Sequence, residues 1–260
     1  MRHCGLDPQS PESNTESWVI LSPVEQRIKQ KIEAVGTPLK DWDIQINYGI
    51  KTGFNEAFII SGEKRKELIE QDPKSDEIIR PLLRGRDIKR YGYQFADLYL
   101  ITTFPSLKID IEQYPAVKQH LMSFGYDRLK QTGEAGARKK TNNQWFETQD
   151  TISYWEDFSK QKIMYSETNN SDDTKVGFDE KGEYFTDKTC FILLGKNETI
   201  TKHIYKLMSS KVFTWYMKMT SPLLGTQGIS LTKESVETFP ACPIGKNYDL
   251  TDDEIQFIEN

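Results

Sequence analysis

Hydrophobic residues recur at helical spacing in the segment 22–36, where they would line one face of an α-helix. Ser22 and Glu25 have the spacing of a capping box, and Pro23 occupies the first helical position. Gly36 follows the last apolar position and is a common helix terminator. We therefore predict a helix that begins after Ser22, with a buried stripe made of Val24, Ile28, Ile32 and Val35.

The pattern then changes from helical spacing to alternation. Apolar and polar residues alternate through segment 42–48, which predicts a half-buried strand. Segment 56–61, with the sequence EAFIIS, predicts a second strand. The connection between them, residues 49–55, contains two glycines, and we expect these to supply positive φ angles in a β-hairpin.

Similar patterns predict the remaining elements. Residues 132–144 have no periodicity and contain two glycines, so they are expected to form a loop that is mobile. Residues 221–244 combine a glycine-rich loop with a proline-rich end. The other predicted elements are a short polar helix at 63–72, a strand at 98–103, a helix at 116–130 interrupted near Gly125, a strand at 160–167, a hairpin at 175–186, a strand at 189–195 and a long amphipathic helix at 198–220.

Strands are grouped centrally and helices lie towards both ends. This order is typical of an α+β fold, because a doubly wound sheet would need strict alternation of strands and helices. We expect a central mixed or antiparallel β-sheet with flanking helices and a long C-terminal amphipathic helix. Residues 18–245 would form one domain, preceded by a disordered leader or non-native extension at 1–17. Residues 246–260 would be a tail or the start of a further helix.

Composition supports a folded domain of this size. The chain has 260 residues, of which 37% are apolar and 12% aromatic, enough to form a sizeable core. Mean hydropathy is −0.64, and no apolar run approaches the roughly 20 residues of a membrane helix. The first residues lack the apolar segment of a signal peptide, so the cytoplasm is the expected compartment. The three cysteines are scattered and do not suggest a disulfide framework or a zinc site; Cys190 is expected to be buried.

The charge distribution is uneven. The net charge of −5 argues mildly against nucleic-acid binding. Residues 80–140, however, contain 12 Lys or Arg against 6 Asp or Glu, so this window is basic and the rest of the chain is acidic. A local basic excess of this kind favours contact with a phosphate backbone, although a solvated basic surface is the alternative.

The glycine-containing segment 49–60, GIKTGFNEAFII, also suggests a phosphate-binding loop. Such a loop needs the order Gly-x-x-x-x-Gly-Lys-Ser/Thr at the start of a helix. Here Lys51 and Thr52 precede Gly53, and we expect a strand to follow, so a structural connection is favoured. No motif for nucleophilic, metal-dependent or methyl-transfer chemistry is assembled from the sequence.

Five segments, in order between residues 18 and 244, resemble the TaqI-like specificity (target-recognition) region of type IIG restriction–modification enzymes. One departure is that Tyr165-Ser166-Glu167 lacks the proline expected before the glutamate. The segments are GIKTGFNEAFII, IIRPLLRGRDIKRY, QWFETQD, FSKQKIMYSE and MSSKVFTWYMK.

The resemblance implies a module that recognises a short sequence in double-stranded DNA for an adenine-N6 methyltransferase, often fused to an endonuclease. The catalytic regions lie upstream in that family and are absent from this sequence. The chain would then be a fragment, a truncated product or a stand-alone subunit that acts with a methyltransferase or endonuclease partner. No cofactor is expected in this chain, because S-adenosylmethionine and Mg²⁺ would belong to the catalytic regions.

Within such a module, basic and amide side chains in loops are the candidates for DNA contact. Basic side chains would neutralise phosphates or bind guanine, and an Asn or Gln would bind adenine. The alternatives are surface ion pairs with Asp76, Glu77 and Asp87, or a solvated linker. The candidates are Arg84, Arg86, Lys89 and Arg90; Arg138, Lys139, Lys140, Asn142 and Asn143; Thr226 and Gln227; and, with a structural role favoured over contact, Lys51, Thr52 and Asn55.

Two other functions compete with DNA recognition. The chain could be a protein-interaction scaffold that docks a methyltransferase or nuclease partner through its terminal helices, because residues 212–217 make the last predicted helix apolar nearly all round. An independent small-molecule enzyme is the least favoured, since no site can be built from the sequence.

Overall fold

The computed structural model describes residues 21–170, 172–226 and 228–259, which form an α+β fold as predicted. None of its helices is long and apolar enough to cross a membrane. The helices are α1 (Pro23–Val35), α2 (Asn55–Phe58), α3 (Gly62–Gln71), α4 (Pro115–Met122), α5 (Tyr126–Leu129), α6 (Glu198–Met208), α7 (Lys211–Thr220), α8 (Lys233–Glu237) and α9 (Asp252–Glu259). The strands are β1 (Thr37–Pro38), β2 (Ile44–Tyr48), β3 (Ile59–Ser61), β4 (Ile79–Leu83), β5 (Ile88–Lys89), β6 (Gly92–Tyr93), β7 (Leu98–Ile101), β8 (Lys162–Ser166), β9 (Thr168–Asn170), β10 (Val176–Asp179), β11 (Phe185–Thr186), β12 (Cys190–Gly195), β13 (Leu223–Leu224), β14 (Gly228–Ser230) and β15 (Pro240–Ala241).

The capping box predicted at the start of α1 is present. The backbone N–H of Ser22 donates to Glu25 Oε2 at 2.7 Å, and the N–H of Glu25 donates back to Ser22 Oγ at 3.4 Å. The hydrogen bonds from Ser22 lower the pKa of Glu25. Ile28 and Ile32 are fully buried, so the predicted apolar stripe faces the interior.

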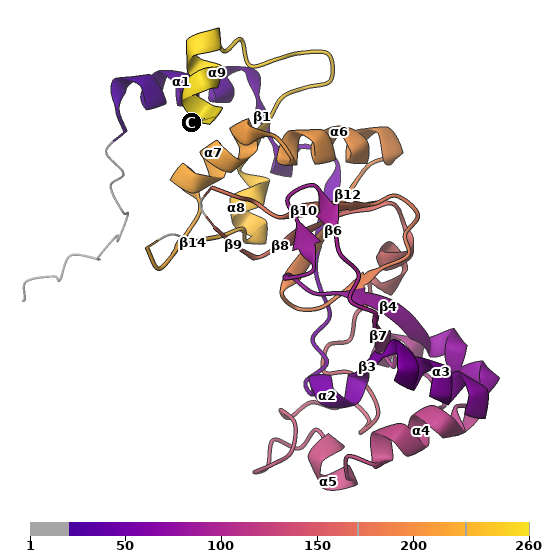
Figure 1. The fold of residues 1–260 in the computed structure, drawn as a ribbon. Helices are drawn as coiled ribbons and strands as arrows, with labels where there is room; N and C mark the ends of the chain where they lie inside the picture. Colours follow the sequence, from indigo (N-terminus) through magenta and orange to yellow (C-terminus); the bar gives the residue numbers. More distant parts are fainter. Residues whose placement is uncertain (1–20, 171, 227, 260) are drawn as a thin grey trace, which may run out of the picture.

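A four-stranded antiparallel sheet in the order β10-β8-β12-β2 separates two hydrophobic cores in the described chain. Along β12, Phe191 and Leu193 pack into one core, while Cys190 and Ile192 pack into the other. Both faces of the strand are therefore buried, which explains its continuous apolar run. Figure 1 shows α6 and α7 on one side of this sheet and β4, β7, α3 and α4 on the other.

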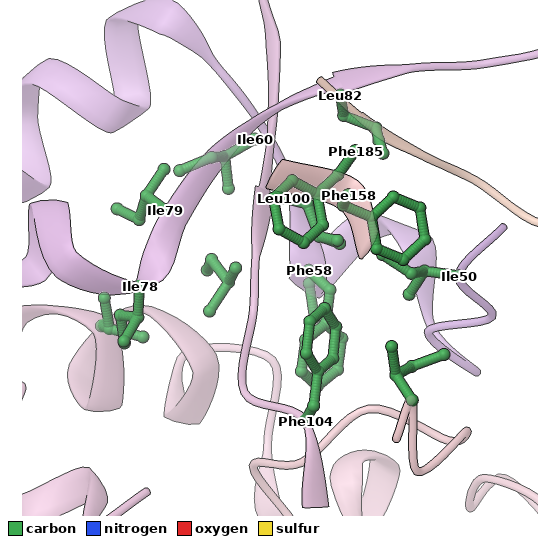
Figure 2. Packing of buried hydrophobic residues seen from close by; sticks show 14 of the residues in the cluster. Ile50, Phe58, Ile60, Ile78, Ile79, Leu82, Leu100, Phe104, Phe158 and Phe185 are labelled. Carbon is green, nitrogen blue, oxygen red and sulfur yellow. The ribbon is translucent and has the colours of Figure 1, made fainter. Parts of the chain in front are cut away.

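The core that contains Cys190 and Ile192, below the central sheet in Figure 1, is called the lower core. It is built on a second sheet, in the order β11-β4-β7-β3. Phe158 and Phe185 stack with ring centroids 4.8 Å apart, and Phe104 lies beyond Phe185 at 6.2 Å. Figure 2 shows these rings surrounded by aliphatic side chains of β3, β4 and β7. The upper core lies between the central sheet and helices α1, α6 and α7.

Both predicted hairpins are wrong, for the same reason. β2 pairs with β12, whereas β3 pairs with β7 in the other sheet. β10 pairs with β8, whereas β11 pairs in parallel with β4. The chain thus crosses between these two four-stranded sheets at residues 49–54 and again at 180–184. Segment 56–61 is also not a continuous strand, because it begins as α2.

The long amphipathic helix predicted at 198–220 is two helices. Ser210 lies between them, and its hydroxyl caps α7 by accepting from the N–H of Phe213 at 3.2 Å. A serine at this position competes for backbone hydrogen bonds and favours a new helix start. Residues 246–260, expected as a tail or a further helix, contain α9, which packs against α7. The leader 1–17 lies outside the described residues.

Candidate nucleic-acid interface

The segment 49–53 is a crossover between the two sheets, and its two glycines have different roles. Gly49 donates its N–H to Cys190 O at 2.9 Å, and a Cβ on it would lie 1.9 Å from Asp187 O. Gly53 has a φ of +78°, as predicted for a turn glycine. Gly49 is therefore required by close backbone approach, and Gly53 by its conformation.

The side chains around the crossover divide into buried and exposed groups. Thr52 is buried; its hydroxyl donates to Asn55 Oδ1 at 2.6 Å and accepts from the N–H of Phe54 at 3.1 Å. Thr52 therefore has a structural role, which we had favoured over DNA contact. Lys51 and Asn55 are exposed. The helix α2 follows this segment where we expected a strand, but it has only four residues and its first turn is held by Thr52.

The basic loop 84–90 contains one internal ion pair. Arg84 makes a bidentate contact with Asp87, from Nε to Oδ2 at 2.8 Å and from Nη2 to Oδ1 at 3.0 Å. Burial raises the pKa of Asp87, but the hydrogen bonds from Arg84 lower it, and the net shift is downward. The Arg84 side chain is only 19% exposed, so the ion-pair alternative holds for this residue in place of the expected DNA contact.

The same loop presents other cations outward. Arg86 and Lys89 are exposed, and Lys89 Nζ donates to Arg86 O at 2.8 Å. The N–H of Gly85 donates to Thr189 Oγ1 at 2.8 Å, which fixes the loop against the turn before β12. Arg90 is partly buried, with Nε 3.8 Å from Asp173 Oδ1.

The loop 131–150 is fixed by a buried guanidinium. Arg138 is 4% exposed and donates only to backbone carbonyls. Burial lowers its pKa to about 10. The basic loop residue expected to contact DNA is instead structural, because every contact it makes lies inside the protein. Its acceptors are Leu129 O at 2.7 Å, Trp145 O at 2.7 Å, Glu147 O at 2.8 Å and Thr52 O at 3.1 Å.

Asn143 is also occupied within this loop. Its Nδ2 donates to Thr148 O at 3.1 Å and Gln149 O at 3.0 Å, so the NH2 group that would be needed for a bidentate contact with adenine is occupied. Lys139, Lys140 and Asn142 are exposed. The structure therefore leaves three of the five predicted residues of this loop available for DNA.

The crossover brings the predicted loops together. The N–H groups of Gln149 and Asp150 donate to Thr52 O and Lys51 O at 3.1 and 3.3 Å. On the other side, Ile50 pairs with Asp187, which donates its N–H to Leu83 O at 3.0 Å. Exposed lysine and arginine residues therefore lie on the loops at both sides of this junction. We call them the basic seam: Lys51, Arg86, Lys89, Lys139, Lys140 and Lys188.

The cations of the basic seam form no close ion pairs among the described residues. Across the described ranges, no seam residue forms an ion pair with a carboxylate, whereas many other lysines and arginines do. Burial raises the pKa of Asp150, and Lys51 and Lys139 act in the opposite direction, which indicates that both lysines lie near this carboxyl. The seam therefore offers positive charge to an external anion.

Lys188 and Thr189 were missed by the sequence prediction. They lie in the turn between β11 and β12; we had predicted Lys188 in a connection and Thr189 as the first residue of a strand. Thr189 binds Gly85, and Glu167 donates its N–H to Thr189 O at 3.0 Å, so the turn joins both sheets to the basic loop. The signal available was the polar sequence TDKT between two apolar strands, since such loops often carry binding residues.

The remaining candidates lie elsewhere. Thr226 is exposed on the β13–β14 hairpin and lines a cavity of about 520 Å³ together with Trp215 of α7 and Phe257 of α9. Gln227 lies outside the described residues. The structure does not bring Thr226 to the basic seam. In α7, Phe213, Tyr216 and Met217 are buried inside this chain, so much of its apolar surface is covered without a partner.

The family model of the TaqI-like C-terminal specificity domain matches residues 80–241, and the chain belongs to this family. The resemblance found in the sequence is thereby confirmed. No curated protein matches the sequence.

Two solved structures share the fold. One is described as the type IIL restriction-modification enzyme MmeI in complex with DNA, with a TM-score of 0.51 and 15% identity over 78% of this chain. The other is the type IIG restriction endonuclease BpuSI, with a TM-score of 0.54 and 14% identity over 91% of this chain. The chain spans about a quarter of each, 25% and 27% of their lengths.

Proposed function

We propose that this domain recognises a short sequence in duplex DNA and positions the catalytic part of a type IIG-like restriction–modification system on it. The observation that supports this most directly is the basic seam, in which exposed cations without ion-pair partners lie on loops held by buried hydrogen bonds. Membership of the specificity-domain family supports the same function. The net charge of −5 makes a local basic surface necessary for DNA binding.

In this proposal the seam residues have different roles. Lys51, Lys139 and Lys140 neutralise phosphates, which sets affinity and register but carries little sequence information. Arg86 and Lys89 also neutralise phosphates, whereas Asn142 can bind adenine. The fixed loops lower the conformational cost of binding, because the side chains are presented from an ordered backbone.

Catalysis belongs to other regions in this proposal. The structural relatives are long restriction–modification proteins of which this chain resembles about a quarter. We propose that an adenine-N6 methyltransferase, and in some arrangements an endonuclease, acts with this domain in one chain or as a partner. S-adenosylmethionine and Mg²⁺ would be bound by those catalytic regions, and the domain itself would only direct them.

Fluorescence anisotropy with a labelled random-sequence duplex tests DNA binding. The expected result is binding at low salt that weakens steeply as salt rises, because phosphate contacts release counterions. The double variant Arg86→Ala/Lys139→Ala should lower the slope of log K against log salt by about two. Lys206→Ala is the matched control. Lys206 is an exposed residue of α6, on the opposite side of the central sheet from the second sheet, and it forms no ion pair among the described residues.

The control variant should bind as the wild type does. Absence of binding at low salt, or equal loss in both variants, would overturn the proposal. Binding to a methyltransferase partner without any DNA binding would instead support the scaffold function, which no present observation favours.

A further inference from the structure

The hairpin formed by β5 and β6 carries an exposed aromatic residue at its tip. Ile88 pairs with Tyr93 and Lys89 with Gly92, so Arg90 and Tyr91 form a two-residue turn. Tyr91 is 64% exposed, which is high for a large aromatic side chain. A single exposed tyrosine is common on protein surfaces, so its surroundings decide whether it has a function.

The base of the hairpin is held in the protein. Ile88 is fully buried, and the rings of Tyr93 and Tyr184 lie 4.8 Å apart. A Cβ on Gly177 of β10 would lie 2.9 Å from Gly92 O, so the hairpin backbone rests directly on the central sheet. The tip therefore projects from a rigid support, and its position is defined.

The Tyr91 ring is also held on one side. The guanidinium of Arg90 lies 5.1 Å from the ring centroid, in a cation–π arrangement. Arg90 is itself oriented towards Asp173, with Nε to Oδ1 at 3.8 Å. An aromatic ring that is already ordered loses less conformational entropy on binding than a free one.

The tip is continuous with the basic seam. Lys89 belongs to β5, and its Nζ donates to Arg86 O at 2.8 Å. The exposed Lys89 thus lies on the same short hairpin as Tyr91, two residues before it. Tyr48, another exposed tyrosine, has different surroundings: burial and the carboxylates of Glu234 and Glu167 raise its pKa. Cations beside Tyr91 favour an anionic polymer as its ligand.

We propose that Tyr91 is a DNA-contacting residue, whose open ring face packs on a thymine methyl group or a deoxyribose when the β5–β6 hairpin enters a groove. A two-stranded ribbon fits the major groove of B-DNA, and a ring face provides apolar contact that does not depend on charge. Arg86 and Lys89 would meet phosphates on the same side. This inference rests on the proposed function of the domain.

The test compares five single variants of the full chain by duplex anisotropy over a range of salt. Tyr91→Ala should weaken binding about tenfold at every salt concentration without changing the salt slope, because the apolar contact of the ring is not ionic. Tyr91→Phe should stay within about twofold of wild type, because it keeps the ring. Arg86→Ala should lower the slope by about one. Phe257→Ala, an exposed aromatic on α9, is the control and should bind normally.

Circular dichroism and thermal unfolding must show that Tyr91→Ala is folded; Tyr91→Ser serves as a second truncation. Wild-type binding by both truncations would overturn the inference while leaving the proposed function intact. A changed slope in Tyr91→Ala would also overturn it, since the residue would then act through neighbouring cations. If wild type binds no duplex, the proposed function and the inference fail together. Loss of partner-protein binding alone would assign the tip to a protein contact.

Discussion

Arg138 Nη1 lies 3.1 Å from the carbonyl oxygen of Thr52, and this hydrogen bond joins two loops 86 residues apart in sequence. The same guanidinium holds Leu129, Trp145 and Glu147 through their carbonyl oxygens. One buried cation therefore orders both the loop that carries Lys139 and Lys140 and the crossover that carries Lys51. The positions of these exposed lysines depend on a residue that is itself hidden from solvent.

Replacing Arg138 should destabilise the fold, because this buried side chain forms four hydrogen bonds. Arg138→Met removes four buried hydrogen bonds and leaves Leu129 O and Trp145 O without their donor, and we expect the free energy of unfolding to fall by about 3 kcal/mol. Urea denaturation measures this. The neighbouring exposed variant Lys139→Ala should change it by less than about 0.5 kcal/mol. Equal stability of the two variants would show that the buried hydrogen bonds contribute little.

Arg84 and Arg86 should separate stability from DNA affinity. Arg84→Ala leaves the Asp87 carboxylate without its bidentate partner, and we expect a loss of about 1–3 kcal/mol in unfolding free energy. Arg86→Ala should leave stability unchanged and lower the salt slope of DNA binding by about one. Urea denaturation and salt-dependent anisotropy on both variants give the comparison. A reversed pattern would contradict the assignment of the two side chains.

The buried pair Lys162–Asp179 should respond asymmetrically to substitution. Asp179 also accepts hydrogen bonds from the N–H groups of Gly182, Glu183 and Tyr184, whereas Lys162 otherwise donates only to Phe158 O. Asp179→Ala therefore leaves a buried ammonium and three N–H groups without their acceptor, and should cost about 3–5 kcal/mol. Lys162→Met leaves Asp179 bonded to backbone and should cost clearly less. Thermal unfolding of both variants checks the order.

Substitution of Gly49 should be far more damaging than that of a glycine in open space. Gly49→Ala puts a methyl group 1.9 Å from Asp187 O, so the two crossing segments must separate. We expect a loss of several kcal/mol, of the order of 3. Gly136 has a φ of +83° with no atom near its missing Cβ, so Gly136→Ala should cost only about 1 kcal/mol. Chemical denaturation of the two alanine variants distinguishes backbone contact from backbone strain.

Stability should fall in acid through Glu254. Its hydrogen bonds from Lys31, Thr251 and Arg27 lower its pKa from 4.5 to about 2. Because the folded pKa is lower than the ordinary value, the carboxylate stabilises the fold above about pH 4.5, and this contribution is lost as pH falls towards about 2. Unfolding measured across this window should show a shallower pH dependence for Glu254→Gln. An unchanged pH profile would exclude this contribution.

Local structure was predictable where its cause is local. The capping box of α1, the helix at 63–72, the interruption at Gly125 and the buried strand β12 all follow from nearby residues. Strand pairing does not follow from nearby residues. The turn residues at 49–55 and 180–184 suit a hairpin, whereas the partner of β2 is β12 and the partner of β11 is β4, both far away in sequence. Pairing across such distances is decided by packing of the two cores.

The candidate site was predictable as loops but not as individual residues. The basic window 80–140 does contain most of the seam. Charge alone cannot distinguish Arg138, which is enclosed by carbonyl groups, from Lys139, which faces solvent. Lys188 and Tyr91 were missed because their importance comes from neighbours on other elements, namely Gly85 beside Thr189 and Arg90 over the ring.

The chain crosses between the two sheets more than once, with β2 and β12 on one side of the crossings and β3 and β11 on the other. Neither core can therefore be assembled from one continuous stretch of sequence. Limited proteolysis should therefore yield no stable fragment that contains only one core. Exchange of one core between related proteins would require the replacement of several separate segments of the chain. Recognition properties would be transferred by moving the entire unit, or changed in place by point substitutions along the seam.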